Sequence, residues 1–232
     1  MPKQYNFFEF DEVTSTNDVC LSEFQKSTKP TVVVANSQTK GRGRNAKNWD
    51  SPKGNISYSL CFKSPSIDPG ITVKIGLITS IAVFDIFNKD VLLKWPNDLI
   101  FNNKKVGGIL VESQNQNNEI IITIGIGINL NIDKKHHEWN DIGLIDITKK
   151  TKDSFIEMLT LKLLKLKNLN RKNWSKEWDE KCMHIGKRVT LGDKQESFLF
   201  EGITDSGQAK LKKKSGDIEL FNESSLKVDG LY

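Results

Sequence analysis

A polar loop is the most informative segment of this sequence, and it runs Gln38-Thr39-Lys40-Gly41-Arg42-Gly43-Arg44-Asn45-Ala46-Lys47-Asn48-Trp49. It follows a β-branched run at residues 31–35, which predicts a strand. Glycines let backbone amides approach an anion, and arginines supply fixed forks of donors for phosphate or carboxylate oxygens. The loop therefore indicates an anion-binding site, and a solvated basic loop is the alternative.

Two other interpretations of this loop fail on their context. Residues 41–46 fit the degenerate dinucleotide pattern G-x-G-x-x-A, but no apolar-periodic helix follows them, so we reject a Rossmann site. The Gly-Arg repeat also resembles RNA-binding segments, yet no basic helix or RNP-type aromatic strand accompanies it. The sequence contains no Walker-type G-x-x-x-x-G-K-[ST] motif either.

On both sides of the loop, hydrophobic periodicity predicts alternating strands and helices. We expect strands at 5–13, 55–62, 91–95, 99–101, 106–112 and 119–130. Helices are expected at 70–88 and 151–169, and the cap-type residues at 14–17 are expected to open a short helix that runs through residue 25. Trp174 and Trp178 stand four residues apart and are expected in the core. Short β-type runs at 188–191, 197–203, 208–213, 218–221 and 226–228 predict a small all-β module. We therefore expect two domains, at 1–183 and 184–232.

The run Lys94-Trp95-Pro96-Asn97-Asp98 sets an amide and a carboxylate side by side at the end of a predicted strand. A carboxylate together with phosphate oxygens is the usual environment of Mg²⁺, so the pair is a candidate for ordering the phosphates of ATP. The same residue types are also common in ordinary turns.

Two glycine-containing strands complete the set. Lys105 precedes Gly107 and Gly108, and paired glycines weaken a strand, which indicates that something approaches that backbone closely. Residues 125–130, Gly-Ile-Gly-Ile-Asn-Leu, alternate small and bulky side chains and so predict one open and one packed face. A bulged or closely packed strand is the alternative for both.

The whole chain has 232 residues and a formal net charge of +5, which alone does not identify a partner. No apolar run near the N-terminus is long enough for a signal segment or a membrane span, so we expect a cytoplasmic protein without membrane contact. Cys20, Cys61 and Cys182 are odd in number and form no metal pattern, and His136 and His137 are adjacent. Neither a disulfide framework nor a zinc site is expected.

Taken together, these segments resemble the biotin–protein ligase family in order and spacing, from about residue 7 to the end of the chain. The motifs are [ST]-T-N at 15–17, Q-x-x-G-R-G-R with a following tryptophan, K-W-P-N-D, K-x-x-G-I-L and G-x-G-I-N. Their combination is far more specific than any single one. Lys40 departs from the small residue that the family often has before the Gly-Arg run.

The resemblance implies an α+β fold, with a mixed-sheet catalytic domain like those of biotin ligases and class II aminoacyl-tRNA synthetases, followed by a small all-β barrel. It implies a monofunctional ligase without an N-terminal DNA-binding domain, so no nucleic-acid partner is expected. Such an enzyme forms biotinyl-5′-adenylate from biotin and ATP with Mg²⁺. It then transfers the biotin to a lysine of a biotin carboxyl carrier protein or domain of a biotin-dependent carboxylase. Whether the chain forms a homodimer stays open.

The same resemblance assigns roles to individual residues. The catalytic residues would be Lys105, Arg42 and Arg44. Biotin would be bound by Ser15, Thr16, Asn17, Gln38, Gly41, Arg42, Lys105, Gly107 and Gly108. ATP and the adenylate would be bound by Arg44, Trp49, Asn97, Asp98 and Asn129, with Asp98 also facing the metal. A lipoate or other acyl–protein ligase of similar fold is the nearest rival, and a nucleic-acid-binding regulatory protein is the rival from another class.

Overall fold

The structure is a computed structural model that describes residues 4–27, 29–116, 119–132, 139–166, 173–192, 196–222 and 226–228. The chain divides into two compact units. The first comprises residues 1–67 and 106–152, and the second comprises residues 68–105 and 153–232. The adjacent histidines of the sequence analysis, His136 and His137, lie outside the described residues.

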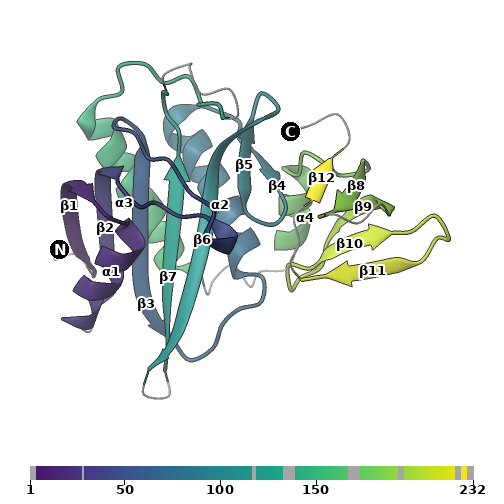
Figure 1. Cartoon of the computed structure of the whole chain (residues 1–232), viewed down its shortest axis with the longest axis horizontal. Helices are drawn as coiled ribbons and strands as arrows, with labels where there is room; N and C mark the ends of the chain where they lie inside the picture. The colour runs from purple at the N-terminus through teal and green to yellow at the C-terminus, as the bar shows by residue number, and fades with distance from the viewer. Residues whose placement is uncertain are drawn as a thin grey trace. The chain divides into compact units, whose positions relative to one another are not determined.

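The first unit is built on a mixed sheet (Figure 1). Its strands follow the order β1 (Asn6–Val13), β2 (Thr31–Gln38), β3 (Ile56–Ser64), β7 (Glu119–Ile128) and β6 (Lys104–Gln116). Strand β1 runs parallel to β2, and the other neighbours are antiparallel. The predicted strands are therefore confirmed, and β6 begins two residues earlier than expected.

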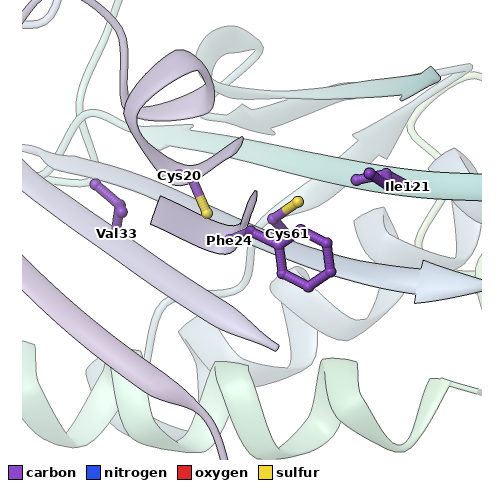
Figure 2. Close-up of a cluster of buried hydrophobic side chains, with 5 residues drawn as sticks. All are labelled: Cys20, Phe24, Val33, Cys61 and Ile121. Carbon is purple, nitrogen blue, oxygen red and sulfur yellow. The ribbon is translucent and has the colours of Figure 1, made fainter. Parts of the chain in front are cut away.

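Helix α1 (Thr16–Gln25) packs on β2, β3 and β7 through a small apolar cluster (Figure 2). The cluster joins Cys20 and Phe24 of α1 to Val33, Cys61 and Ile121 of the three strands. Burial raises the pKa of both thiols, that of Cys61 to about 11. Both cysteines are free, and they serve as small apolar residues in the core.

Strand β3 shows the predicted alternation, but both of its faces are buried at its start. Tyr58 and Leu60 lie on one face, while Ser59 and Cys61 lie on the face toward α1. Buried hydroxyl groups need hydrogen-bond partners. Ser59 is therefore turned toward polar groups at the start of α1, and the candidate site is built there.

In its described residues, the second unit contains three helices, a hairpin and a separate sheet. Its helices are α2 (Ile71–Phe87), α3 (Lys149–Leu164), whose first turn belongs to the first unit, and α4 (Trp174–Glu180). The hairpin pairs β4 (Leu92–Lys94) with β5 (Asp98–Phe101). Trp174 and Trp178 are buried, as predicted. The predicted end of α3, at residues 167–169, lies outside the described residues.

The separate sheet is antiparallel and has the order β11 (Ile218–Phe221), β10 (Ala209–Lys212), β9 (Ser197–Ile203), β8 (Arg188–Leu191) and β12 (Leu226–Val228). Every predicted β run after residue 187 contains one of these strands. The predicted α+β class, with a mixed sheet followed by a small all-β part, is confirmed. The domain boundary at residue 183 stays a prediction. In the described part of the chain, no helix is long and apolar enough to cross a membrane.

Candidate active site

Side chains at the start of α1 and the end of β2 are joined by hydrogen bonds. The backbone N–H and the hydroxyl group of Thr16 donate to Gln38 Oε1, over 2.8 and 3.0 Å. Gln38 Nε2 donates to Ser51 Oγ, over 2.7 Å. The sequence analysis predicted that Thr16 and Gln38 serve one ligand, and the structure places them in direct contact.

Ser59 of β3 extends this set of contacts and was not predicted as a site residue. Its hydroxyl oxygen is fully buried, 2.8 Å from Thr16 Oγ1 and 2.6 Å from Asn17 Oδ1. The polar face of the alternating strand was the sequence signal that could have indicated it. We call Ser15, Thr16, Asn17, Gln38, Ser51 and Ser59 the polar cluster.

Arg42 lies beside the polar cluster and is held by two carboxylates. Its five N–H groups donate to Glu112, Asp18 and Ser15, over distances of 2.7 to 3.1 Å. Hydrogen bonds from Arg42 to Asp18 and then to Glu112 raise the pKa of the guanidinium above its usual range. The sequence analysis predicted substrate oxygens as the partners of Arg42, and it missed both carboxylates.

The glycines of β7 make room for two of the predicted residues. A Cβ atom at Gly125 would lie 2.5 Å from Asn17 Oδ1, and one at Gly127 would lie 2.7 Å from the ring of Trp49. The predicted open face of this strand is therefore filled by side chains from α1 and from the Gly/Arg loop. Trp49 also stacks on Trp139, with ring centroids 5.5 Å apart and an interplanar angle of 15°. Trp139 lies outside every motif, and sequence reasoning missed it.

The Gly/Arg loop folds back on itself as a narrow ribbon. Gln38 forms a bridge with Ser51, Arg42 forms one with Asn48, and Trp49 N–H donates to the carbonyl oxygen of Gly41 over 3.0 Å. A Cβ atom at Gly41 would lie 2.4 Å from the carbonyl oxygen of Trp49, so this position requires glycine. Arg44 starts a short 3₁₀ turn at the tip, Arg44–Ala46.

The remaining predicted residues of the first unit lie at the paired start of β6 and just after β7. Gly107 and Gly108 stand opposite Ile128 and Gly127. Asn129 is buried; its backbone N–H donates to the carbonyl oxygen of Val106, and its side-chain amide donates to the carbonyl oxygen of Asn140. These contacts fix the strand ends.

The second unit carries the other predicted residues, at the β4–β5 hairpin. Lys105 Nζ lies 2.6 Å from Asp98 Oδ1, and both side chains are largely buried. Burial lowers the pKa of Lys94, and the charge of Lys105 acts in the same direction. Asn97 occupies the turn before Asp98. The structure therefore brings two lysines and the predicted metal-facing carboxylate together.

The donor atoms at this hairpin fit a magnesium ion that ATP brings with it. Among the described residues, no group of three His, Cys, Asp or Glu side chains could hold a metal ion. Magnesium is commonly bound through one or two carboxylates together with substrate phosphates and water. Asp98 could supply one such carboxylate, although here it is paired with Lys105.

The fold assigns the chain to a class of protein, since a mixed sheet with helices and a small antiparallel sheet is the fold of biotin ligase catalytic domains. The family model for the biotin/lipoate A/B protein ligase family matches residues 7–129. The chain belongs to this family.

Individual relatives give the same assignment. A biotin–protein ligase 2 of Arabidopsis thaliana is 38% identical over 109 residues, which are 44% of this chain and 33% of that protein. A biotin–[acetyl-CoA-carboxylase] ligase of Paracoccus denitrificans is 32% identical over 87 residues, 35% of this chain and 36% of that protein. The matched stretches thus span about a third of these curated relatives.

Among solved structures, a biotin protein ligase from Aquifex aeolicus in complex with biotin and ATP is 29% identical, with a TM-score of 0.78. The superposition covers 97% of this chain and 99% of that one.

Proposed function

We propose that this protein is an ATP-dependent biotin–protein ligase. It would form biotinyl-5′-adenylate from biotin and ATP and then transfer the biotin to a lysine of a carrier domain. The observation that carries the proposal is the polar cluster, in which buried and partly buried donors and acceptors run from Ser51 through Gln38 and Thr16 to Asn17. A neutral ureido ring needs such partners to offset its loss of hydration.

In this proposal, biotin binds to the first unit. Biotin would be held by the polar cluster and by the backbone of the Gly/Arg loop and of β6, through Ser15, Thr16, Asn17, Gln38, Gly41, Arg42, Gly107 and Gly108. Trp49, Arg44 and Asn129 would bind the adenylate. The ring of Trp49 suits an adenine, because a base can stack on an aromatic face.

Charged side chains would act in the chemical step. In that step a carboxylate oxygen of biotin attacks the α-phosphorus of ATP, and pyrophosphate leaves. Lys105 would stabilise the negative charge that builds up on the carboxylate and phosphate oxygens, with Arg42 and Arg44 as further cations. Asn97 and Asp98 would face the phosphates, and magnesium would neutralise part of their charge.

A carrier lysine would then attack the anhydride carbonyl, which releases AMP and leaves biotin in amide linkage. The relative named for acetyl-CoA carboxylase supports a carrier domain of a biotin-dependent carboxylase as the acceptor. A cytoplasmic location and the absence of a nucleic-acid partner stay predictions from the sequence.

The test is ATP–pyrophosphate exchange by the purified protein with Mg²⁺, comparing added biotin, added lipoate and no acid. Exchange with biotin alone, lost in Lys105→Ala and retained in Lys104→Ala, is the expected result. Lys104 is the matched control, because it neighbours Lys105 and is exposed. Exchange that persists in Lys105→Ala would contradict the catalytic role of that lysine.

The family itself gives a reason to test lipoate, since its description covers both biotin and lipoate ligases. The two acids differ in the ureido ring, which lipoate lacks. Exchange with lipoate instead of biotin would keep the reaction class and change the substrate. Exchange with neither acid would overturn the proposed function.

A further inference from the structure

Glu112 of β6 contacts both Asn17 and Arg42, although the proposed function gives it no role. Its Oε2 accepts a hydrogen bond from Asn17 Nδ2 over 2.7 Å and one from an Arg42 terminal nitrogen over 2.9 Å. Its Oε1 accepts from Arg42 Nε over 3.0 Å. One carboxylate therefore joins the polar cluster to the Gly/Arg loop.

Asp18 provides the comparison, because it also holds Arg42 but contacts a different set of groups. It accepts two hydrogen bonds from the guanidinium, over 2.7 and 2.9 Å, and its side chain is 56% exposed, against 38% for Glu112. The side-chain amide of Asn17 donates to Glu112. Glu112 therefore couples Arg42 to Asn17, whereas Asp18 pairs with Arg42 at the surface.

The charge of Glu112 decides which way the amide of Asn17 points. An ionised carboxylate only accepts hydrogen bonds, so it must face the NH₂ group of Asn17 and not its oxygen. Asn17 Oδ1 is then turned toward Ser59 Oγ, 2.6 Å away, and the hydroxyl group of Ser59 donates to it. Ser59 has one hydroxyl proton, so a proton given to Asn17 Oδ1 is not available for Thr16 Oγ1, which lies 2.8 Å from Ser59 Oγ.

The same constraint continues into the substrate pocket that the proposed function assigns to biotin. Three short oxygen–oxygen contacts link Asn17, Ser59, Thr16 and Gln38. Two hydroxyl protons serve them, and Glu112 commits the proton of Ser59. The hydroxyl proton of Thr16 serves Gln38 Oε1, which also accepts a hydrogen bond from the backbone N–H of Thr16.

We propose that Glu112 is a positioning residue that sets the donor–acceptor polarity of the biotin pocket through Asn17, and so helps select a ureido ring over an acid without one. The inference rests on the proposed function. It assigns Glu112 an effect on biotin binding that acts through Asn17 and is separate from the pairing of Arg42 with Asp18.

The test is calorimetric titration of biotin into the wild type, Glu112→Gln, Asp18→Asn, Asn17→Ala and the double variant Glu112→Gln/Asn17→Ala. Glutamine has the size of glutamate but offers either an oxygen or an NH₂ group, so the amide of Asn17 is free to reverse. We expect Glu112→Gln to weaken biotin binding about tenfold, as for loss of a charge-assisted hydrogen bond. Asp18→Asn should change it less than about threefold.

The double variant separates positioning from a merely structural role. If Glu112 acts through Asn17, then adding Glu112→Gln to Asn17→Ala causes no further loss of affinity, since contacting residues are not additive. The KM for ATP in the exchange reaction should also stay within about twofold of the wild type in Glu112→Gln. Each variant is checked by its urea midpoint, and an unfolded Glu112→Gln is replaced by Glu112→Asp, which keeps the charge and should bind biotin better than Asn17→Ala.

The outcomes distinguish the inference from the function on which it rests. A wild type that does not bind biotin overturns both. A wild type that binds biotin, with Glu112→Gln binding equally well or losing affinity additively with Asn17→Ala, overturns the inference alone. Equal losses of biotin affinity in Glu112→Gln and Asp18→Asn would mean that Glu112 only holds Arg42 in place, which also overturns the inference.

Discussion

At Gly125 and Gly127 of β7, a change to alanine would add a methyl group that collides with a different site residue in each case. A Cβ atom at Gly125 would lie 2.5 Å from Asn17 Oδ1, and one at Gly127 would lie 2.7 Å from the ring of Trp49. Overpacking of this kind costs roughly 1–3 kcal/mol. Under the proposed function, we expect Gly125→Ala to raise the KM for biotin about tenfold and Gly127→Ala to raise the KM for ATP by a similar factor.

The measurement is steady-state exchange kinetics with each substrate varied in turn. Gly43→Ala is the matched control, because the nearest atom to its Cβ would be Lys47 O at 3.7 Å, an ordinary contact. Loss of both affinities in both variants would show that the strand as a whole is displaced, and the separate assignments would fail.

His184 in the second unit predicts a dependence of stability on pH. Burial, and then the charges of Lys94 and Lys187, lower its pKa from 6.5 to about 3. The unfolded chain takes up the proton near pH 6.5, whereas the folded chain does so only near pH 3. The contribution to stability is therefore complete above pH 6.5 and is lost as the pH falls toward 3, by about 1.4 kcal/mol per pH unit.

This prediction is checked by urea denaturation of the wild type and His184→Gln at pH 7 and pH 5. From pH 7 to pH 5, the wild type should lose about 2 kcal/mol more of its unfolding free energy than the variant. Other titrating groups are common to both proteins and cancel. Equal losses in the two proteins would mean that His184 titrates normally in the folded state.

At the scale of single residues, the sequence predicted site residues that belong to compact motifs, but it did not predict the residues that contact them from distant segments. Thr16, Gln38 and Trp49 were predicted because their neighbours along the chain carry a pattern. Glu112 contacts Arg42 across 70 positions, and Trp139 reaches Trp49 from a segment without a motif. Contacts of that kind depend on strand pairing and register, which periodicity alone does not determine.

At the scale of elements, an ion pair joins the buried Lys74 in the first turn of α2 to Asp68, which lies just before the helix. Lys74 Nζ is 2.5 Å from Asp68 Oδ2, its side chain is 3% exposed, and it also lies 4.8 Å from the ring centroid of Trp174. Removing one member of such a pair leaves a buried charge, whereas an apolar side chain of similar length does not. We expect Asp68→Asn to cost about 3 kcal/mol of unfolding free energy and Lys74→Met less than about 1.5 kcal/mol.

Asparagine is chosen because Asp68 Oδ1 also accepts a hydrogen bond from the N–H of Gly70, which the amide oxygen can retain. Thermal and urea denaturation of both single variants and the double variant give the comparison. The double variant should resemble Lys74→Met. A double variant as unstable as the sum of the two would contradict the explanation by an uncompensated charge.

The geometry of the turn between β9 and β10 depends on one glycine. Gly207 has φ +79°, and a Cβ atom there would lie 2.7 Å from Val73 Cγ2 and 2.8 Å from Gly70 Cα of the segment that opens α2. Its carbonyl oxygen accepts a hydrogen bond from Trp95 Nε1 over 2.9 Å. The turn is thereby fixed against both α2 and the β4–β5 hairpin.

We expect Gly207→Ala to cost about 3 kcal/mol or more, because backbone strain adds to a collision with backbone atoms. Gly216→Ala is the matched control in the same sheet, since its φ is +99° and a Cβ atom would meet nothing within 4 Å. The difference between their urea midpoints measures the close approach alone. Equal urea midpoints for the two variants would mean that the turn can move away from α2 at no cost in stability.

The elements themselves were largely predictable, and the exceptions have local causes. The short strands after residue 187 were found because Gly192, Gly207 and Gly216 separate them, each with positive φ. Residues 14–17 are of the types that cap helices, but the hydroxyl group of Ser15, at the N-cap position of α1, accepts from Arg42 and makes no cap hydrogen bond. A local preference was overruled there by a long-range contact.

At the scale of the whole molecule, the distribution of charge bears on the class of partner. The chain has 34 Lys and Arg residues against 29 Asp and Glu residues, a small excess for its length. Arg42, in the most basic motif, donates all five of its N–H groups to protein acceptors, including two carboxylates. The loop that suggested a nucleic-acid partner is therefore partly neutralised by its own surroundings.

This charge distribution predicts weak binding to a random DNA duplex, because few phosphates would be neutralised. A protein that neutralises many phosphates loses affinity by about a thousandfold or more between 50 and 200 mM salt, whereas one contact gives only a few-fold change. We expect less than about a tenfold change for this chain in fluorescence anisotropy without ATP, and an unchanged salt slope in Arg42→Gln. A steep slope that falls by about one unit in Arg42→Gln would mean that the arginine leaves its carboxylates for phosphate, and the nucleic-acid interpretation would then return.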